Sequence, residues 1–324
     1  LAALENVNVL LVAEVSSAYI GLRTTQLLLV QTKADLKIQK ELARLTQDKY
    51  HSGLASAIDV NQAEYQLSNT QAVIPKLETE IETYQNALSV LLGEPAGSLK
   101  TRLDSDAHNL LQAPFKFQMQ KLYALPIEVL RLRPDVRASE SALKAQNAEV
   151  GVAIASLFPS VSLSALLGLK SVHLHNLLEK DSYTYSYQPS IQTTLFHFGA
   201  LWQNVKMQEA HLRASSAQYE KTLLQATAEV RNVLVGLKKM KERHADLELA
   251  WRKMDKAAQL ARSRYKSGLV DYFQVLDAEE RRIAAQSALT TSSGLLYQNI
   301  INFYKAVGGQ FSFNLLKKET AENE

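Results

Sequence analysis

The side chains that could do chemistry are few and lie in two places. Asp277 follows Phe273 by four residues, so a helix would carry both on one face. Taken alone, Asp277 is typical of a solvated acid near a helix start, where the helix dipole favours it. The second place holds His173 and His175, which are two positions apart and could ligate a metal. Two histidines without a carboxylate cluster are, however, typical of an ordinary loop. Neither place by itself predicts a catalytic or metal site.

The composition excludes several classes of protein. The chain has 324 residues and no cysteine, which rules out a disulfide framework, a thiol nucleophile and a cysteine metal site. It also lacks a phosphate loop, a zinc signature and a credible Ser-His-Asp arrangement. We therefore predict that the protein is not an enzyme and has no catalytic residue, no metal and no cofactor.

Charge and hydropathy narrow the class further. The chain has 36 basic and 33 acidic residues, and its formal net charge of +3 is too balanced for a nucleic-acid-binding protein. The local basic run Lys238-Lys239-Met240-Lys241 is typical of a solvated helix face. No run of 18 apolar residues occurs, so no membrane-spanning helix is expected.

A duplicated unit must position these residues. The motif Y-x-S-G-L occurs at Tyr50 to Leu54 and again 215 positions later at Tyr265 to Leu269. Without gaps, residues 13–93 and 228–308 are identical at 16 of 81 positions. A repeat has to be recognised before any fold is assigned. We predict two similar helical hairpins, each turning at its Y-x-S-G-L motif.

Each hairpin is predicted to consist of two long helices. The 68 residues between Gly199 and Gly268 contain one glycine and no proline, enough for a helix of about 100 Å. Residues 1–52 have equally few breakers, and the return legs cover about 57–92 and 272–307. Small and polar residues surround isolated Leu and Val, so each helix offers only a narrow apolar seam. Such helices cannot bury a globular core and are predicted to pack side by side with other copies of the chain.

Between the repeats, residues 160–170 and 183–195 alternate with period two. One alternate set is apolar or aromatic and the other is mostly polar. Transmembrane barrel strands show this pattern over about 9–11 residues. A hairpin of a soluble protein with one solvent-exposed face shows the same pattern. In lipid, several chains would each have to donate a hairpin, because two strands leave edge groups unpaired. The predicted membrane strand residues are Val161, Leu163, Leu167, Tyr183, Tyr185, Tyr187 and Ile191.

Further motifs follow in order along most of the chain. They are Arg133-Pro134-Asp135-Val136-Arg137, Phe158-Pro159, Leu195-Phe196-His197-Phe198-Gly199, Val275-Leu276-Asp277-Ala278 and Tyr304-Lys305-Ala306-Val307-Gly308-Gly309. In this order and spacing, the chain resembles the TolC-like outer-membrane efflux factors, in the branch that serves resistance-nodulation-division (RND) pumps.

The resemblance implies a mainly α fold with a small β part. Two pseudo-repeated helical hairpins would form a trimeric periplasmic α-barrel, and the strands would contribute to a trimeric transmembrane β-barrel. The homotrimer would lie in the outer membrane of a Gram-negative bacterium, in contact with its lipid, and would span the periplasm. Its implied partners are a periplasmic adaptor (membrane fusion) protein and an inner-membrane RND pump. It would pass small molecules such as drugs or toxic compounds passively to the exterior.

The resemblance also assigns sites. Phe273, Asp277 and Glu280 would surround the pore aperture, where three Asp277 carboxylates around one axis would attract cations. Glu279 and Glu280, which stand where the family usually has Gln-Arg, would make this region more acidic than usual. The periplasmic tip, and the contact with the adaptor, would comprise Tyr50, Gly53, Leu54, Tyr265, Gly268 and Leu269.

Two further departures affect the expected boundaries. The first strand pair and the lipid-carrying cysteine of this branch would precede Leu1, so we expect a fragment of a longer protein. The family's Trp after the last glycine pair is replaced by Gln310-Phe311. The expected divisions are a first hairpin (1–98), an equatorial connector (99–130), a helix leading to the membrane (131–158), a strand pair (159–196), a second hairpin (197–308) and a polar tail (309–324).

Two other functions remain open at this point. One is the outer-membrane duct of a type I protein secretion system, which belongs to the same family. The other is a soluble coiled-coil scaffold, which would need no membrane.

Overall fold

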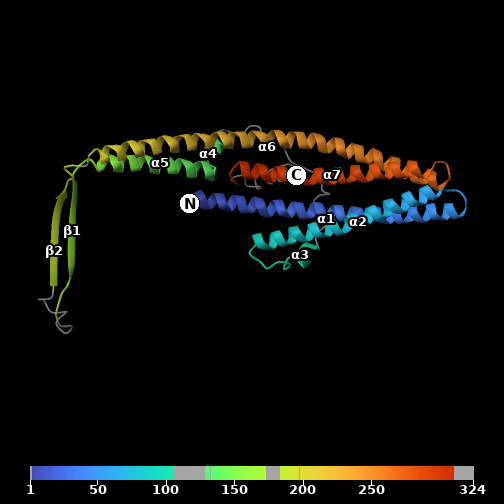
Figure 1. The fold of residues 1–324 in the computed structure, drawn as a ribbon, viewed down its shortest axis with the longest axis horizontal. Helices are drawn as coiled ribbons and strands as arrows, with labels where there is room; N and C mark the ends of the chain where they lie inside the picture. Colours follow the sequence, from blue (N-terminus) through green and yellow to red (C-terminus); the bar gives the residue numbers. More distant parts are fainter. Residues whose placement is uncertain (1, 105–127, 132, 173–182, 197, 310–324) are drawn as a thin grey trace, which may run out of the picture. The chain divides into compact units, whose positions relative to one another are not determined.

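The chain is mainly helical with one small sheet, which confirms the predicted fold class. It divides into two compact units, described separately below: a hairpin unit of residues 1–135 and 225–324, and a ribbon unit of residues 136–224 (Figure 1). The computed structural model describes residues 2–104, 128–131, 133–172, 183–196 and 198–309. The predicted polar tail, apart from Gly309, and most of the equatorial connector lie outside the described residues.

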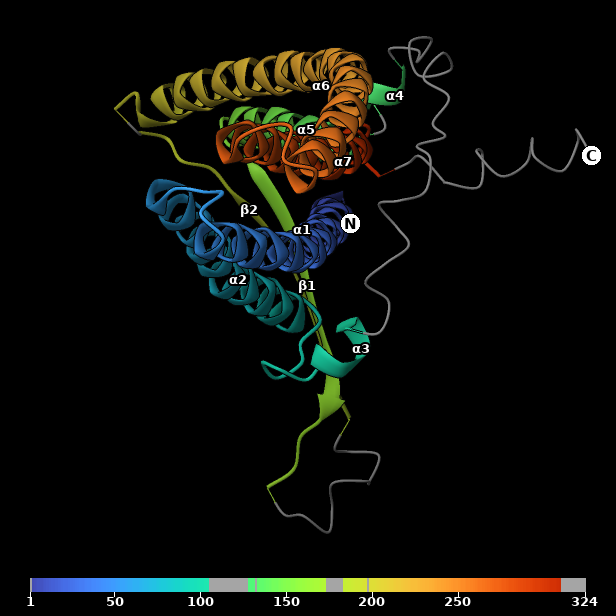
Figure 2. The ribbon, with the colours of Figure 1, turned by 90° about the vertical axis from the view of Figure 1, so that its right-hand side faces the viewer.

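Four long helices make up most of the hairpin unit. In this unit α1 packs against α2 and α7, and α7 packs against residues 225–266 of α6. Figure 2 shows them following one another in the order α2, α1, α7, α6. Each long helix begins and ends close to the limits that the sequence predicts. The elements are α1 (Ala2–His51), α2 (Ala57–Leu91), α3 (Lys100–Asp104), α4 (Glu128–Arg131), α6 (Ala200–Lys266) and α7 (Tyr272–Ala306).

Both helical turns close by the same backbone bonds. Gly53 has a φ of 74° and donates its N–H to the carbonyl of Tyr50 at 2.9 Å. The next residue, Leu54, donates to the carbonyl of Lys49 at 2.8 Å. This bond pair satisfies the last carbonyls of a helix and requires a left-handed residue, for which glycine carries no steric cost. The second turn repeats the geometry, with Gly268 at a φ of 73°.

Polar contacts join the two hairpins along α1 and α7. Thr290 donates to Gln31 at 2.9 Å, and Gln298 donates to Ser17 at 2.7 Å. Between these bonds the Thr24 side chain of α1 packs directly on Gly294 and leaves no room for a Cβ there. Small and polar residues at the seam explain why the helices contact one another without a continuous apolar stripe.

Apolar burial is confined to three small clusters, as the narrow seams predict. The cluster beside the turns draws on all four long helices, and the other two each join neighbouring helices. Among the described residues, no helix combines the length and apolar character needed to cross a membrane. The clusters are Leu42, Ala63, Tyr265, Tyr272 and Val275; Leu237, Phe303 and Val307; and Leu22, Leu88 and Leu99.

The ribbon unit holds α5 (Pro134–Ala155) apart from its first two residues, β1 (Ser160–Leu169), β2 (Tyr183–Gln192) and residues 200–224 of α6. The strands pair antiparallel, with Val161 opposite Ile191 and Leu169 opposite Tyr183. This register puts the apolar set of β1 and the aromatic set of β2 on one face, because paired residues point to the same side. The predicted two-faced ribbon is therefore present, slightly shorter than the alternating sequence.

Arg133 ties the end of α7 to the start of α5 within the hairpin unit. Its buried guanidinium donates to the Ala306 carbonyl at 2.7 Å and reaches Asp135 and Glu229 at 2.8 Å each. Burial alone would lower the pKa of Arg133, but its bonds to Asp135 and Glu229 outweigh burial and raise it. Gly308 packs beside this arginine with a φ of 71°.

We expect Gly308→Ala to lower the free energy of unfolding by about 2–4 kcal/mol, because a left-handed alanine is strained and the added methyl overpacks the site. Its Cβ would lie 2.9 Å from Pro134 Cδ and 3.0 Å from Arg133 Cα. Gly93, its repeat equivalent, also has a φ of 71° but faces open space, so Gly93→Ala should cost only about 1 kcal/mol. Urea unfolding followed by circular dichroism measures both, and equal losses would contradict the packing argument.

Candidate functional site

The first turns of α7 carry the predicted aperture residues on the surface. Asp271 caps the helix by accepting from the N–H of Gln274 at 3.2 Å. Phe273 is 63% exposed and Glu280 is exposed. Asp277 is half exposed, and its carboxylate accepts from Arg281 Nε at 2.9 Å. The exposed face therefore offers one aromatic ring and two carboxylates, one of which is already paired.

Glu279 does not add charge to this face, contrary to the expectation from the sequence. Its side chain is 1% exposed and turns inward, where it binds Arg262 of α6 and accepts from Arg282 Nε at 2.9 Å. Glu64 occupies the same place in the first repeat and is exposed. The region is therefore less acidic at its surface than the sequence predicts, because the extra carboxylate is neutralised in the interior.

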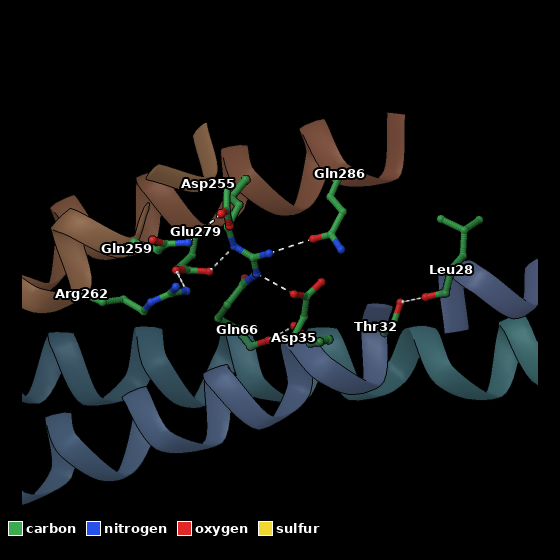
Figure 3. Close-up of polar contacts among 11 residues, drawn as sticks. Leu28, Thr32, Asp35, Gln66, Asp255, Gln259, Arg262, Glu279 and Gln286 are labelled. Carbon is green, nitrogen blue, oxygen red and sulfur yellow. Dashed lines mark hydrogen bonds and ion pairs between the residues drawn. The ribbon is translucent and has the colours of Figure 1, made fainter. Parts of the chain in front are cut away.

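Arg282 is the centre of a buried polar cluster that the sequence did not reveal. Besides Glu279, it binds Asp35 of α1 at 2.5 Å and Gln286 at 2.8 Å. Figure 3 shows Asp35, Glu279, Arg262 and Gln286 converging from α1, α6 and α7. Two cations and two carboxylates balance the charge of the cluster. Burial alone would lower the pKa of Arg282, but its bonds to Asp35 and Glu279 outweigh burial and raise it.

A cavity of about 420 Å³ lies beside this cluster, between α1, α2 and α7. Its lining is largely amide and hydroxyl side chains, and it includes both the buried Asp35 and the exposed Glu280. The cluster therefore borders the predicted aperture face. The lining residues are Leu28, Gln31, Thr32, Asp35, Gln66, Asn69, Thr70, Val73, Glu280, Ile283, Ala284, Gln286 and Ser287.

The two helical turns differ in their aromatic residues despite their shared backbone. Tyr265 is only 3% exposed, and its hydroxyl is 3.0 Å from that of Thr46. Lys49 of α1 lies 4.0 Å from the Tyr265 ring centre and donates to its carbonyl. Burial raises the pKa of Tyr265. Tyr50, the repeat equivalent, is exposed. Tyr265 thus holds the second turn against α1 and is not a surface residue of this chain.

The remaining predicted tip residues do reach the surface. Leu54 is 77% and Leu269 is 73% exposed, each directly after the glycine of its turn. Ser56 caps α2 by accepting from the N–H of Asp59 at 3.2 Å, and the Asp59 carboxylate in turn accepts from the N–H of Ser56. A rigid cap and a glycine turn therefore present one leucine at each tip.

The ribbon has an apolar face that the described residues of its own unit leave exposed. The seven predicted membrane strand residues are 66–83% exposed. Their pairing puts Leu167 opposite Tyr185 and Leu163 opposite Pro189. The other face carries mainly serine, threonine and glutamine, and Ser162 and Ser190 lie 2.7 Å apart through their hydroxyls. A contiguous exposed apolar face of this kind marks contact with lipid or with another chain.

Within the described ranges, no group of three or more His, Asp or Glu side chains could hold a metal ion. The candidate ligands His173 and His175 lie outside those ranges.

The chain is similar in sequence and fold to known proteins. The family model for outer membrane efflux proteins matches residues 1–94 and 125–309. The probable efflux pump outer membrane protein TtgC of Pseudomonas putida is 32% identical over 310 residues, which span 95% of this chain and 62% of TtgC. The cation efflux system protein CusC of Escherichia coli is 29% identical over 311 residues, 94% of this chain and 64% of CusC. The structure of the outer-membrane channel OprN matches with a TM-score of 0.82 and 34% identity, covering 95% of this chain and 68% of that one.

We expect Arg282→Met to lower the free energy of unfolding by about 3–5 kcal/mol, because it leaves Asp35 and Glu279 buried without their shared cation. The neighbouring Arg281→Met, which removes only an exposed pair with Asp277, should cost less than about 1 kcal/mol. Denaturant unfolding of both variants measures the difference. Similar small losses would show that the buried cluster contributes little to stability.

Proposed function

The chain belongs to the outer membrane efflux protein family, and from this membership we propose that it is the exit duct of a tripartite efflux pump. It would lie in the outer membrane and pass small molecules passively to the cell exterior. The observation that supports this most is the exposed apolar ribbon face, which a water-soluble scaffold would have to cover. The chain spans about 62% of the length of TtgC.

The same observation supports a proposal of self-assembly. An isolated two-stranded ribbon has unpaired backbone groups along both edges, which lipid cannot satisfy. We propose that three copies donate their ribbons to one closed transmembrane barrel. Their hairpins would form a helical tunnel across the periplasm, linked to an adaptor protein and an inner-membrane pump. No catalysis by this chain is needed for passage.

The relatives point to small molecules as cargo. Among them are proteins named for toluene, solvent, antibiotic and cation efflux. This range favours a small-molecule duct over the protein secretion duct. The compounds carried by this protein would be selected by its pump.

We propose that the aperture lies at the start of α7, with Phe273, Asp277 and Glu280 toward the axis. Because Arg281 pairs with Asp277 and Glu279 is buried, the exposed face retains a formal charge of about −1 per chain from Asp277, Glu280 and Arg281. In a trimer this would give a modest preference for cations. Opening would be a shift in the population of tip conformations, biased by a bound partner.

The aperture is tested by recording the complete protein in a planar bilayer. We expect Asp277→Ala combined with Glu280→Ala to raise single-channel conductance and to lower the cation-to-anion permeability ratio by about twofold or more, because both pore carboxylates are removed. As a control, Glu149→Gln replaces an exposed acidic residue of α5 and should change neither the conductance nor the permeability ratio. If the wild-type protein formed no channels in the bilayer, the proposed function would be wrong. If the double variant kept the wild-type selectivity, only the assignment of these residues to the aperture would be wrong.

The tips are tested by adaptor binding. We expect Leu54→Asp combined with Leu269→Asp to reduce adaptor co-purification by about tenfold, because the charges oppose burial of both leucines in a contact. Leu224→Asp, at an exposed leucine in the ribbon unit, should leave binding unchanged. Equal recovery of adaptor with all three proteins would exclude the tips as the docking surface.

A further inference from the structure

The cavity between α1, α2 and α7 is lined by two carboxylates and by no basic residue. Asp35 is buried and Glu280 is exposed. The neighbouring Arg282 and Arg262 already balance the charges of Asp35 and Glu279. Glu280 therefore leaves the surroundings of the cavity with a formal charge of about −1, which attracts cations and disfavours anions.

One oxygen of Asp35 has no partner in the protein. Oδ1 accepts from Arg282 at 2.5 Å, whereas Oδ2 accepts no hydrogen bond from the described residues (Figure 3). Burial raises the pKa of Asp35, because the bond to Arg282 does not fully offset the loss of water around the carboxylate. The carboxylate can therefore accept a further hydrogen bond from a cationic donor.

Gln66 contributes a second unused polar group to the same cavity. It lines the cavity from α2 and is only 5% exposed. Its side-chain amide makes no hydrogen bond with any other residue that the structure describes. Buried amides are rarely left in this state, because the lost hydrogen bonds to water are not replaced. The amide therefore indicates a partner that is not part of the chain.

The two acids of the cavity are not a consequence of the duplicated unit. The offset of 215 takes Asp35 to Ala250 and Glu280 to Tyr65. The repeat therefore requires a carboxylate at neither place, and the pair is specific to this cavity.

The size and the rest of the lining favour an organic cation over a metal ion. The volume of about 420 Å³ lies within the range of about 300–1,000 Å³ that is usual for small-molecule sites. Among the described residues, no three acidic or histidine side chains come together as metal ligands. Leu28, Val73 and Ile283 supply apolar surface. A primary ammonium group with an apolar tail matches this lining, because its three N–H donors suit the free acceptors.

We propose that this cavity binds one primary organic ammonium ion. Its nitrogen donates to Asp35 Oδ2 and to the side-chain carbonyl of Gln66, and its tail lies against the three apolar residues. Glu280 adds electrostatic attraction at the exposed side. This deepens the proposed function, since Glu280 faces the duct in that proposal and the ion enters from there. The bound ion connects α1, α2 and α7 beside the aperture face.

Protection of an introduced cysteine tests the site in the complete protein, because this chain has no cysteine of its own. Ser287 is exposed and lines the cavity, so a cysteine there should react with methyl methanethiosulfonate. We expect saturating hexylammonium to slow modification of Ser287→Cys by about fivefold or more, because a bound ligand is largely enclosed by its pocket. Hexanol, which has the same tail without the charge, should leave the rate unchanged. The matched control is Ser52→Cys, at an exposed position of the first turn, whose rate neither compound should change.

Substitutions in the Ser287→Cys protein test the groups that hold the ion. We expect the hexylammonium concentration for half-maximal protection to rise about tenfold in Asp35→Asn and about threefold in Glu280→Gln, because a buried charged partner contributes more than an exposed one. Ala284→Leu fills the cavity without removing a member of the buried cluster and should abolish protection, which keeps the test decisive if Asp35→Asn fails to fold. Glu82→Gln removes an exposed acid of α2 outside this cavity and should leave the concentration unchanged.

Three results would overturn the proposal: equal protection by hexanol, a Ser287→Cys protein that the reagent does not modify, or equal protection in the Ala284→Leu protein. Recording the same preparation in a planar bilayer separates the site from the duct. Channels without protection would refute the ammonium site and leave the duct standing. Protection without channels would support the site and contradict the proposed function.

Discussion

The arrangement of the hairpin unit depends on one buried cation. Arg282 holds a carboxylate from its own helix, Glu279, and one from the first hairpin, Asp35, and Glu279 in turn holds Arg262 of α6. Arg282, Asp35 and Glu279 are each at most 7% exposed, so removing one of them leaves a buried charge without its partner. The groups of the cluster therefore stabilise one another. The cluster thereby sets where the second hairpin lies along the first. The aperture face at the start of α7 is positioned by the same helix turns that carry these residues.

The apolar contacts between the long helices are narrow. This makes the buried cluster important, and it also leaves much of the molecule's surface exposed. The long helices contact one another through small and polar residues, and their apolar clusters hold only a few side chains each. An apolar ribbon face remains exposed. The proposed assembly would cover it, with lipid and other copies of the chain supplying the missing contacts.

The repeat accounts for the success of the sequence prediction and for its failures. Gly53 and Gly268 turn alike because only the backbone is involved, and the offset of 215 carries glycine to glycine. Identical or equivalent side chains behave differently once the two copies pack against each other. Tyr50 is exposed and Tyr265 is buried, while Glu64 is exposed and Glu279 is buried. A sequence repeat specifies equal local structure, but the second copy meets α1 where the first copy meets solvent or another partner.

Helix length, turn position and strand alternation were determined by the sequence alone, because each depends on residues close together in the chain. Few breakers give long helices, glycine permits the turn, and period two gives the ribbon its two faces. The pairing of Asp35 with Arg282, 247 positions apart, was decided only by the tertiary structure. Nothing local to either residue indicates its partner. Whether a carboxylate near α7 is a surface charge or an interior ion therefore became evident only when the hairpins were seen packed together.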